Sequence, residues 1–259
     1  MTFLEHIGVL RWHLVRSAII ILAFAIVAFV FPEIIFDEIL LAPKNQDFIT
    51  YRMLCQLADI TGVEEIRITD FSYSLQSIKL AAQFTTHIWV SVLVGFVLAF
   101  PYVIWEVWRF IKPALKENER KNATGFVLIS SILFLIGVAF GYFIISPMAV
   151  NFLGTYKVSQ SVANNISFTS FISTVTTSTL STGLVFELPI VIYFLSRISI
   201  VTPKLMRHYR RHAIVVVFIL SAVITPSTDM ISQILVAVPL LILYEISISV
   251  SARVVRKRK

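Results

Sequence analysis

The chain alternates between long apolar runs and short polar segments, and six of the runs have the length of a membrane-spanning helix or come close to it. Crossing about 30 Å of hydrocarbon takes roughly 20 helical residues. The runs predict spans at about 17–36, 80–104, 124–146, 171–195, 212–225 and 230–250. The third span is expected to stop before Pro147. The fifth, with about 14 residues, reaches only about 21 Å as a helix.

Two of the polar segments between the spans have some length. Residues 37–78 hold seven acidic residues, and residues 147–170 include Asn151, Asn164 and Asn165. Both are expected to form caps of short helices and turns on the outer side. The chain shows no internal repeat, no low-complexity segment and no soluble domain. The pattern therefore predicts an all-α integral membrane protein whose residues 1–259 form a single polytopic domain.

The basic residues set the orientation of these spans. Seventeen of the 22 Lys and Arg residues fall in four short segments, at 11–16, 109–121, 197–211 and 253–259. Loops rich in Lys and Arg stay on the cytoplasmic side of a membrane. An even number of spans returns the chain to the side from which it started. Both termini are therefore predicted to be cytoplasmic.

Composition supports a membrane protein and argues against a nucleic-acid partner. The chain is 57% hydrophobic and 14% charged, whereas a soluble domain carries about 25% charged residues. Its net charge of +7 comes from residues beside apolar runs, where they hold the topology and meet anionic lipid. The single cysteine, Cys55, excludes an intramolecular disulfide and any CxxC motif.

Motifs of the common enzyme classes are missing. The sequence has no Gly-rich phosphate loop, no HExxH, no Cys/His cluster that could hold a metal and no Gly-x-Ser-x-Gly. We therefore expect a protein that is not an enzyme and needs no metal or cofactor.

One acidic residue lies in the middle of an apolar run. Glu187 stands in the segment LVFELPIV, where an ionisable group costs about 3 kcal/mol and usually faces a cavity or a partner. It could be a structural acid bonded to Ser or Thr, the coupling carboxylate of a solute transporter, or a docking point for another helix. Pro189 is expected to kink this helix. Glu106 and Glu245 lie nearer the span ends, where snorkelling accounts for them.

The loop between the second and third spans reads WEVWRFIKPALKENERKN from residue 105. Its Trp residues suit the membrane interface. On one straight helix, Phe110 and Glu119 would face opposite ways. A break at Pro113 lets both contribute to a single surface.

Five motifs, in this order along the chain, resemble those of a known protein family. They are HIGVLRWHL at 6–14, Leu41-Ala42-Pro43, VWRFIKPAL continuing to Glu119-Arg120-Lys121 at 107–121, FELP at 186–189, and TPSTDMISQ at 225–233. Together they resemble the TatC family, the receptor and core subunit of the twin-arginine protein translocase. The resemblance runs through nearly the whole chain, and the loop at 107–121 is its most specific part.

The resemblance implies a function. Family members bind twin-arginine signal peptides of folded cargo at the cytoplasmic face, work with single-span TatA and TatB subunits and other copies of themselves, and use the proton-motive force. It implies a place in the bacterial cytoplasmic (inner) membrane. It also implies site residues: for the signal peptide, Glu119, Phe110, Arg11, Leu10 and Glu5; for intramembrane contact with partners, Glu187 and Gln233; for structure, Pro43, Pro113, Pro189, Pro226 and Asp229.

One position departs from the family pattern HLxELRxRL. The acidic residue of that motif is Val9 here, which cannot accept a hydrogen bond from an arginine. Either another carboxylate takes its place, with Glu5 and Glu117 as candidates, or one arginine contact is weaker.

Two other functions fit part of the pattern. A proton-coupled solute transporter would use Glu187 but leave the loop motifs unexplained, since transporters place broken helices around a midplane site. A structural scaffold for assembly is the third possibility. Binding of a twin-arginine peptide, compared with its twin-lysine variant, separates the three.

Overall fold

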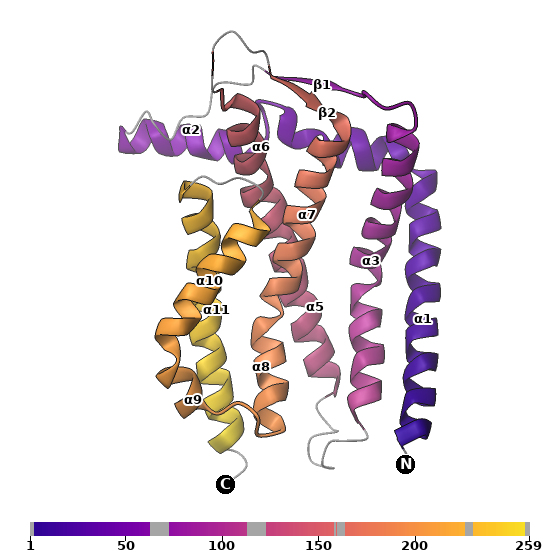
Figure 1. Ribbon diagram of the computed structural model, residues 1–259, viewed down its shortest axis with the longest axis vertical. Coiled ribbons are helices and arrows are strands. Elements are labelled where there is room, and N and C mark those ends of the chain that lie inside the picture. Colours follow the sequence, from indigo (N-terminus) through magenta and orange to yellow (C-terminus); the bar gives the residue numbers. More distant parts are fainter. Residues whose placement is uncertain are drawn as a thin grey trace. The chain divides into compact units, whose positions relative to one another are not determined.

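The computed structural model describes residues 3–62, 73–112, 123–157, 159, 164–225 and 230–256. The chain forms two compact units (Figure 1). The first comprises Met1–Ile39 and Lys79–Leu133, and the second comprises Leu40–Ile78 and Phe134–Lys259. The prediction of a single domain over residues 1–259 stays a prediction.

The first unit is built on two long helices, α1 (Phe3–Val30) and α3 (Ala82–Ile111), which run side by side. Gly95 allows them to pack closely. A Cβ at this position would lie 2.7 Å from Ala25 N and 2.7 Å from Ile21 O, closer than real Cβ atoms come to a backbone. The start of α5 (Ala123–Phe140) joins this unit, where Phe126 stacks on Trp108 at 4.7 Å.

The second unit gathers the remaining helices. The end of α5 continues through the π-helix η5 (Gly141–Ile145) into α6 (Ser146–Thr155). Next come α7 (Phe168–Phe186), α8 (Leu188–Arg197), α9 (Pro203–His208), α10 (Arg210–Ile224) and α11 (Met230–Arg256). Helix α7 packs on η5 and α6, and α11 packs on α8 and α10. Gly183 permits the close approach of α7 and α5, because a Cβ there would lie 2.7 Å from Val138.

The second unit also contains the caps predicted from the polar segments. The 3-10 helix η2 (Ala42–Lys44) leads into α2 (Ile49–Thr61), which ends at Gly62 in the left-handed conformation with φ of 71°. The sequence pattern did not predict the strands β1 (Ser74–Gln76) and β2 (Asn165–Ser167), which pair in parallel. A three-residue strand is too short to produce a period-two signal.

The first and third spans differ from their predicted bounds. Helix α1 starts at Phe3 instead of residue 17 and stops at Val30, since Pro32 has no N–H to continue the ladder; the π-helix η1 (Ile34–Leu40) follows. The third span does not stop before Pro147. Pro147 occupies the first turn of α6, where its missing N–H has no role, and Ser146 Oγ donates to Gly141 O at 2.9 Å.

The other spans lie close to their predictions. The second and sixth are α3 and α11, with Pro101 and Pro239 inside them. The fourth is broken at Glu187 into α7 and α8, as Pro189 led us to expect. The fifth is α10, which has 15 residues.

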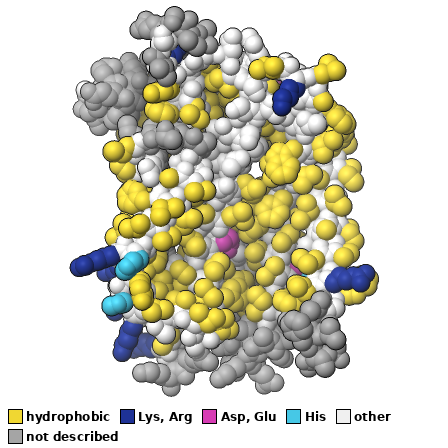
Figure 2. All heavy atoms as spheres, in the orientation of Figure 1, with side chains coloured by type: hydrophobic (Ala, Val, Ile, Leu, Met, Phe, Trp, Pro, Cys, Tyr) yellow, Lys and Arg dark blue, Asp and Glu magenta, His cyan; other side chains and the backbone are white. Residues whose placement is uncertain are grey.

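Five helical stretches are long and apolar enough to cross a membrane: Gly8–Val30, Ala82–Ile111, Gly125–Thr155, Phe168–Arg197 and Gln233–Arg256. At most 39% of the apolar window in any of them is buried inside the molecule. Apolar side chains accordingly cover the surface along the helices, and basic and histidine side chains gather toward one end of α9 and α10 (Figure 2). Such a surface requires a nonpolar solvent, which the hydrocarbon core of a bilayer supplies.

Candidate functional site

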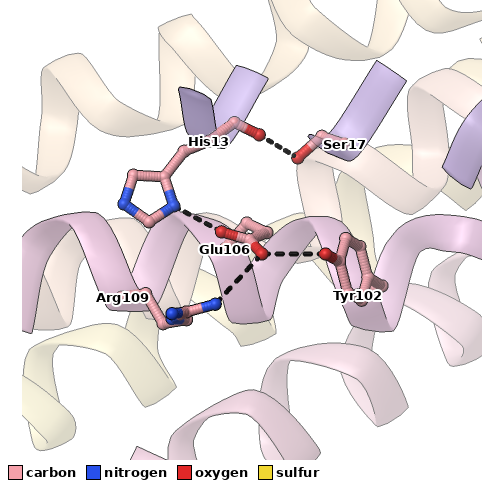
Figure 3. A network of polar contacts seen from close by, with 5 residues as sticks. All are labelled: His13, Ser17, Tyr102, Glu106 and Arg109. Carbon is pink, nitrogen blue, oxygen red and sulfur yellow. Dashed lines mark hydrogen bonds and ion pairs between the residues drawn. The ribbon is translucent and has the colours of Figure 1, made fainter. Parts of the chain in front are cut away.

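A buried carboxylate on α3, Glu106, links this helix to His13 on α1 (Figure 3). The Glu106 side chain is only 1% exposed. Its Oε2 contacts Nδ1 of His13 on α1. Its Oε1 accepts a hydrogen bond from the hydroxyl of Tyr102 at 2.8 Å and lies 3.4 Å from Nη1 of Arg109. Ser17 Oγ donates to His13 O at 2.9 Å, one turn further along α1.

The spacing along α3 explains how this cluster forms. Tyr102, Glu106 and Arg109 follow one another at four and three residues, which places them on one face of a helix. That face meets α1, so His13 completes the cluster from the neighbouring helix. A carboxylate taken out of water is costly unless it is hydrogen-bonded and paired with cations. Here both oxygens of Glu106 have partners.

The contacts of Glu106 are unequal. The Tyr102 hydroxyl lies at an ordinary hydrogen-bond distance, whereas the 3.4 Å contact with Arg109 is longer than the usual range of about 2.7–3.2 Å. The Arg109 side chain is also 43% exposed. Its guanidinium lies 4.8 Å from the centre of the Trp105 ring, a second favourable position for the charge. Arg109 is therefore the loosely held member of the cluster.

This cluster corrects one sequence interpretation. Snorkelling places a charged group in water, but Glu106 is buried. The spacing of Tyr102, Glu106 and Arg109 was visible in the sequence. His13 lies 93 residues away, and nothing in a single sequence pairs it with Glu106.

The residues predicted to bind a signal peptide are partly brought together. Phe110 is half-buried near the end of α3, and its ring centre lies 6.1 Å from that of His13 in an edge-to-face arrangement. Leu10 and Arg11 are exposed on α1, within a turn of His13. The N-terminal part of α1 and the C-terminal end of α3 thus form one surface, with His13 at their contact.

Several predicted residues cannot be placed in this surface. Glu119, Pro113, Pro226 and Asp229 lie outside the described residues. Glu5 belongs to α1, but its side chain also lies outside the described part of the chain. The assignments of these residues stay predictions.

Glu187 lies at the break between α7 and α8 and is 8% exposed. Its amide donates to Leu184 O at 3.1 Å, and its carbonyl accepts from Ile190 N at 2.9 Å. Pro189 is buried in the first turn of α8, where a missing N–H leaves no carbonyl unsatisfied. The helix break therefore lies at a buried carboxylate of the second unit.

Gln233 and Pro43 connect elements of the second unit. Gln233 Nε2 donates to Phe218 O at 3.2 Å and links the start of α11 to α10. Pro43 is buried in η2, and its carbonyl lies 2.9 Å from the hydroxyl of Tyr51, which also lies 3.0 Å from Pro147 O. Burial raises the pKa of Tyr51, so its hydroxyl keeps the proton that this contact needs. Sequence reasoning did not single out Tyr51.

Within the described residues, no group of three or more His, Cys, Asp or Glu side chains could hold a metal ion.

Comparisons with known proteins agree with this architecture. A family model described as Sec-independent protein translocase protein (TatC) matches residues 5–239. The chain is 39% identical over 260 residues to the Sec-independent protein translocase protein TatC of Blattabacterium sp. subsp. Periplaneta americana (strain BPLAN), covering 100% of this chain and 97% of that relative. It is 39% identical over 171 residues to TatC of Aquifex aeolicus (strain VF5), covering 66% of this chain and 70% of the relative.

Solved structures show the same fold. A crystal structure of the twin arginine translocase receptor TatC in DDM is similar with a TM-score of 0.72 at 33% identity, covering 94% of this chain and 97% of that one. A second crystal structure of the receptor gives a TM-score of 0.68 at 31% identity, covering 95% and 97%. The six-span membrane fold predicted from the apolar runs is confirmed. The chain belongs to the TatC family of Sec-independent protein translocase proteins.

Proposed function

We propose that this protein binds the twin-arginine signal peptides of folded cargo at the surface formed by the N-terminal end of α1 and the C-terminal end of α3. One observation carries the proposal: His13 contacts both Glu106 and Phe110, so segments that begin and end nearly 100 residues apart act as one surface. The similarity to two crystal structures of a twin arginine translocase receptor supports the same function.

The chemistry of the surface suits such a peptide. Paired arginines bind best to carboxylates that they can grip with two parallel hydrogen bonds. Glu119, in the loop that follows α3, is the carboxylate we assign to one arginine. An apolar residue after the arginines would pack on Phe110 and on the exposed side chain of Leu10. Arg11 lies next to Leu10 and keeps this end of α1 basic.

The wider assembly follows from the family. We propose that the protein lies in the bacterial cytoplasmic membrane with both termini in the cytoplasm. It organises the translocation complex with single-span TatA and TatB subunits and with other copies of itself, driven by the proton-motive force. Glu187, at a helix break in an apolar setting, and Gln233, at the contact of α10 with α11, are the intramembrane contacts we assign to these partners.

Site-specific cross-linking tests this function. Membranes that contain the protein would be incubated with a cargo precursor carrying a photoreactive residue beside either Arg-Arg or Lys-Lys. We expect a cross-link to the protein that depends on Arg-Arg and weakens in Glu119→Ala, at unchanged expression and membrane insertion. Equal cross-linking of the two precursors would contradict the proposal.

A further inference from the structure

We infer that Glu106 is a second carboxylate for the signal peptide, and that Arg109 occupies it in the absence of peptide and is displaced by an arginine of the peptide. The inference rests on the proposed function, because it assigns a further binding residue to the same surface. It treats Arg109 as an internal competitor of the peptide.

The charges at the paired helix ends show why a carboxylate is needed at this surface. Among the described residues 8–16 of α1 and 98–112 of α3, Glu106 is the only acid. The same stretches carry four exposed cations: Arg11, Arg16, Arg109 and Lys112. A dicationic peptide is repelled by such a surface unless a carboxylate is available, since like charges brought together weaken binding. Val9, the exposed residue one turn before His13, offers no acceptor.

The unequal contacts of Glu106 carry the second step. His13 contacts Oε2, and the Tyr102 hydroxyl donates to Oε1 at 2.8 Å, so both fix the carboxylate from the protein side. Arg109, whose side chain is 43% exposed, lies 3.4 Å from Oε1. An oxygen has room for two donors. A peptide guanidinium can therefore replace that of Arg109 while Tyr102 and His13 keep their contacts.

Trp105 offers the Arg109 guanidinium a favourable position away from the carboxylate. Arg109 already lies 4.8 Å from the centre of that ring, so its charge keeps a favourable neighbour when the carboxylate is taken. Displacement then costs one contact of 3.4 Å, which is longer than an ordinary hydrogen bond and whose arginine is half-exposed although its carboxylate is buried. The gain is a new charge-assisted hydrogen bond to a buried carboxylate, which is a stronger one.

The exchange makes an unusual prediction: removing a cation from the receptor tightens binding. The full-length protein in detergent would be titrated with a fluorescent signal peptide carrying Arg-Arg, and its anisotropy measured. We expect Arg109→Ala to bind about twofold to fivefold more tightly, the effect of removing one long ion pair that competes with the peptide. Since Arg109 is half-exposed at the end of a helix, its replacement should leave the fold intact.

Two further variants isolate the cause. Arg197→Ala removes an equal charge from the end of α8, where Arg197 lies 5.2 Å from the centre of the Tyr193 ring, and should leave affinity unchanged. Glu106→Gln keeps one acceptor oxygen, for either His13 or Tyr102, but removes the negative charge, and should weaken binding. In the double variant Arg109→Ala/Glu106→Gln, the gain from Arg109→Ala should disappear, because the two residues act on one contact.

The outcomes separate the inference from the proposed function. Unchanged or weaker binding by Arg109→Ala, an equal gain in Arg197→Ala, or a gain that persists beside Glu106→Gln would each overturn the exchange while leaving the proposed function intact. The proposed function itself fails if the unmodified protein binds Arg-Arg and Lys-Lys peptides equally.

Discussion

At the scale of single residues, burial decides what each acid does. Glu106 and Glu245 look alike in the sequence, each near a span end. Glu245 is about half exposed and pairs with Arg210 at 2.6 Å on the surface, so snorkelling accounts for it. Glu106 is 1% exposed and joins two helices. Which acid becomes structural depends on the helix that packs against it.

Two buried tyrosines outside the membrane spans differ in a way that a matched pair of variants can test. The Tyr51 hydroxyl lies within hydrogen-bond distance of two buried prolines' carbonyls, whereas the Tyr73 hydroxyl is buried without a hydrogen-bond partner among the described residues. We expect Tyr51→Phe to lower stability by about 0.5–1.5 kcal/mol, because it removes a buried hydroxyl and its hydrogen bonding to these carbonyls. Tyr73→Phe should be neutral or stabilising. Thermal unfolding in detergent measures both, and equal effects would contradict the assignment.

The raised pKa of Tyr73 predicts that the effect of Tyr73→Phe on stability depends on pH. Burial raises the pKa of Tyr73 to about 12, above its ordinary value of about 10. A group whose pKa is higher in the folded state stabilises the fold fully below its unfolded pKa, and that contribution is lost as the pH rises from about 10 through about 12. The stability of Tyr73→Phe relative to the unmodified protein should therefore increase above pH 10 and be constant below it.

At the scale of elements, close helix contacts require small residues at particular positions. Gly95→Ala places a Cβ against the backbone of α1 and should destabilise the protein and weaken twin-arginine cross-linking by separating α1 from α3. Gly125→Ala is the matched control, because a Cβ at Gly125 meets nothing within 4 Å and alanine is the better helix former. Similar losses in both variants would show that the contact at Gly95 does not hold the helices.

The break between α7 and α8 is the second feature at this scale. If Glu187 receives a polar side chain of a partner, Glu187→Ala should impair transport and recruitment of the TatA subunit more than peptide binding. Glu187→Gln should be milder, since an amide keeps hydrogen bonding. Transport of cargo into inverted vesicles measures the first effect and cross-linking to TatA the second. Wild-type transport by both variants would leave Glu187 a structural acid.

At the scale of the whole molecule, α10 is the span that fits a membrane least well. Its 15 residues extend about 22 Å at roughly 1.5 Å per residue, against about 30 Å of hydrocarbon. A short span thins the bilayer or gains cover from neighbours. The turn after it, at 226–229, lies outside the described residues. We predict that this turn lies below the outer headgroups.

Cysteine labelling tests that depth. In a Cys55→Ala background, a cysteine replaces Ser227 or Thr228 and is treated with a membrane-impermeant thiol reagent from the outer side. Labelling should be slow, and slower still with partner subunits present. A cysteine replacing Ser159, in the polar segment predicted to lie outside, should react quickly and serves as the control. Fast labelling of the turn cysteine, both with and without partner subunits, would contradict a thinned membrane at this turn.

The sequence by itself determined the membrane class, the number of spans and the family, because length, apolarity and loop motifs are local properties that need no partner helix. It also located the break at Glu187, since a proline acts on its own helix. It did not determine where α1 begins and ends. Nor did it determine that the third span continues past Pro147, which follows the π-helix η5 and the hydrogen bond from the Ser146 hydroxyl to Gly141 O. Only the tertiary structure joined His13 to Glu106 and left Arg109 loosely held. Pairing between residues 93 apart follows from how two helices pack, which no local pattern encodes.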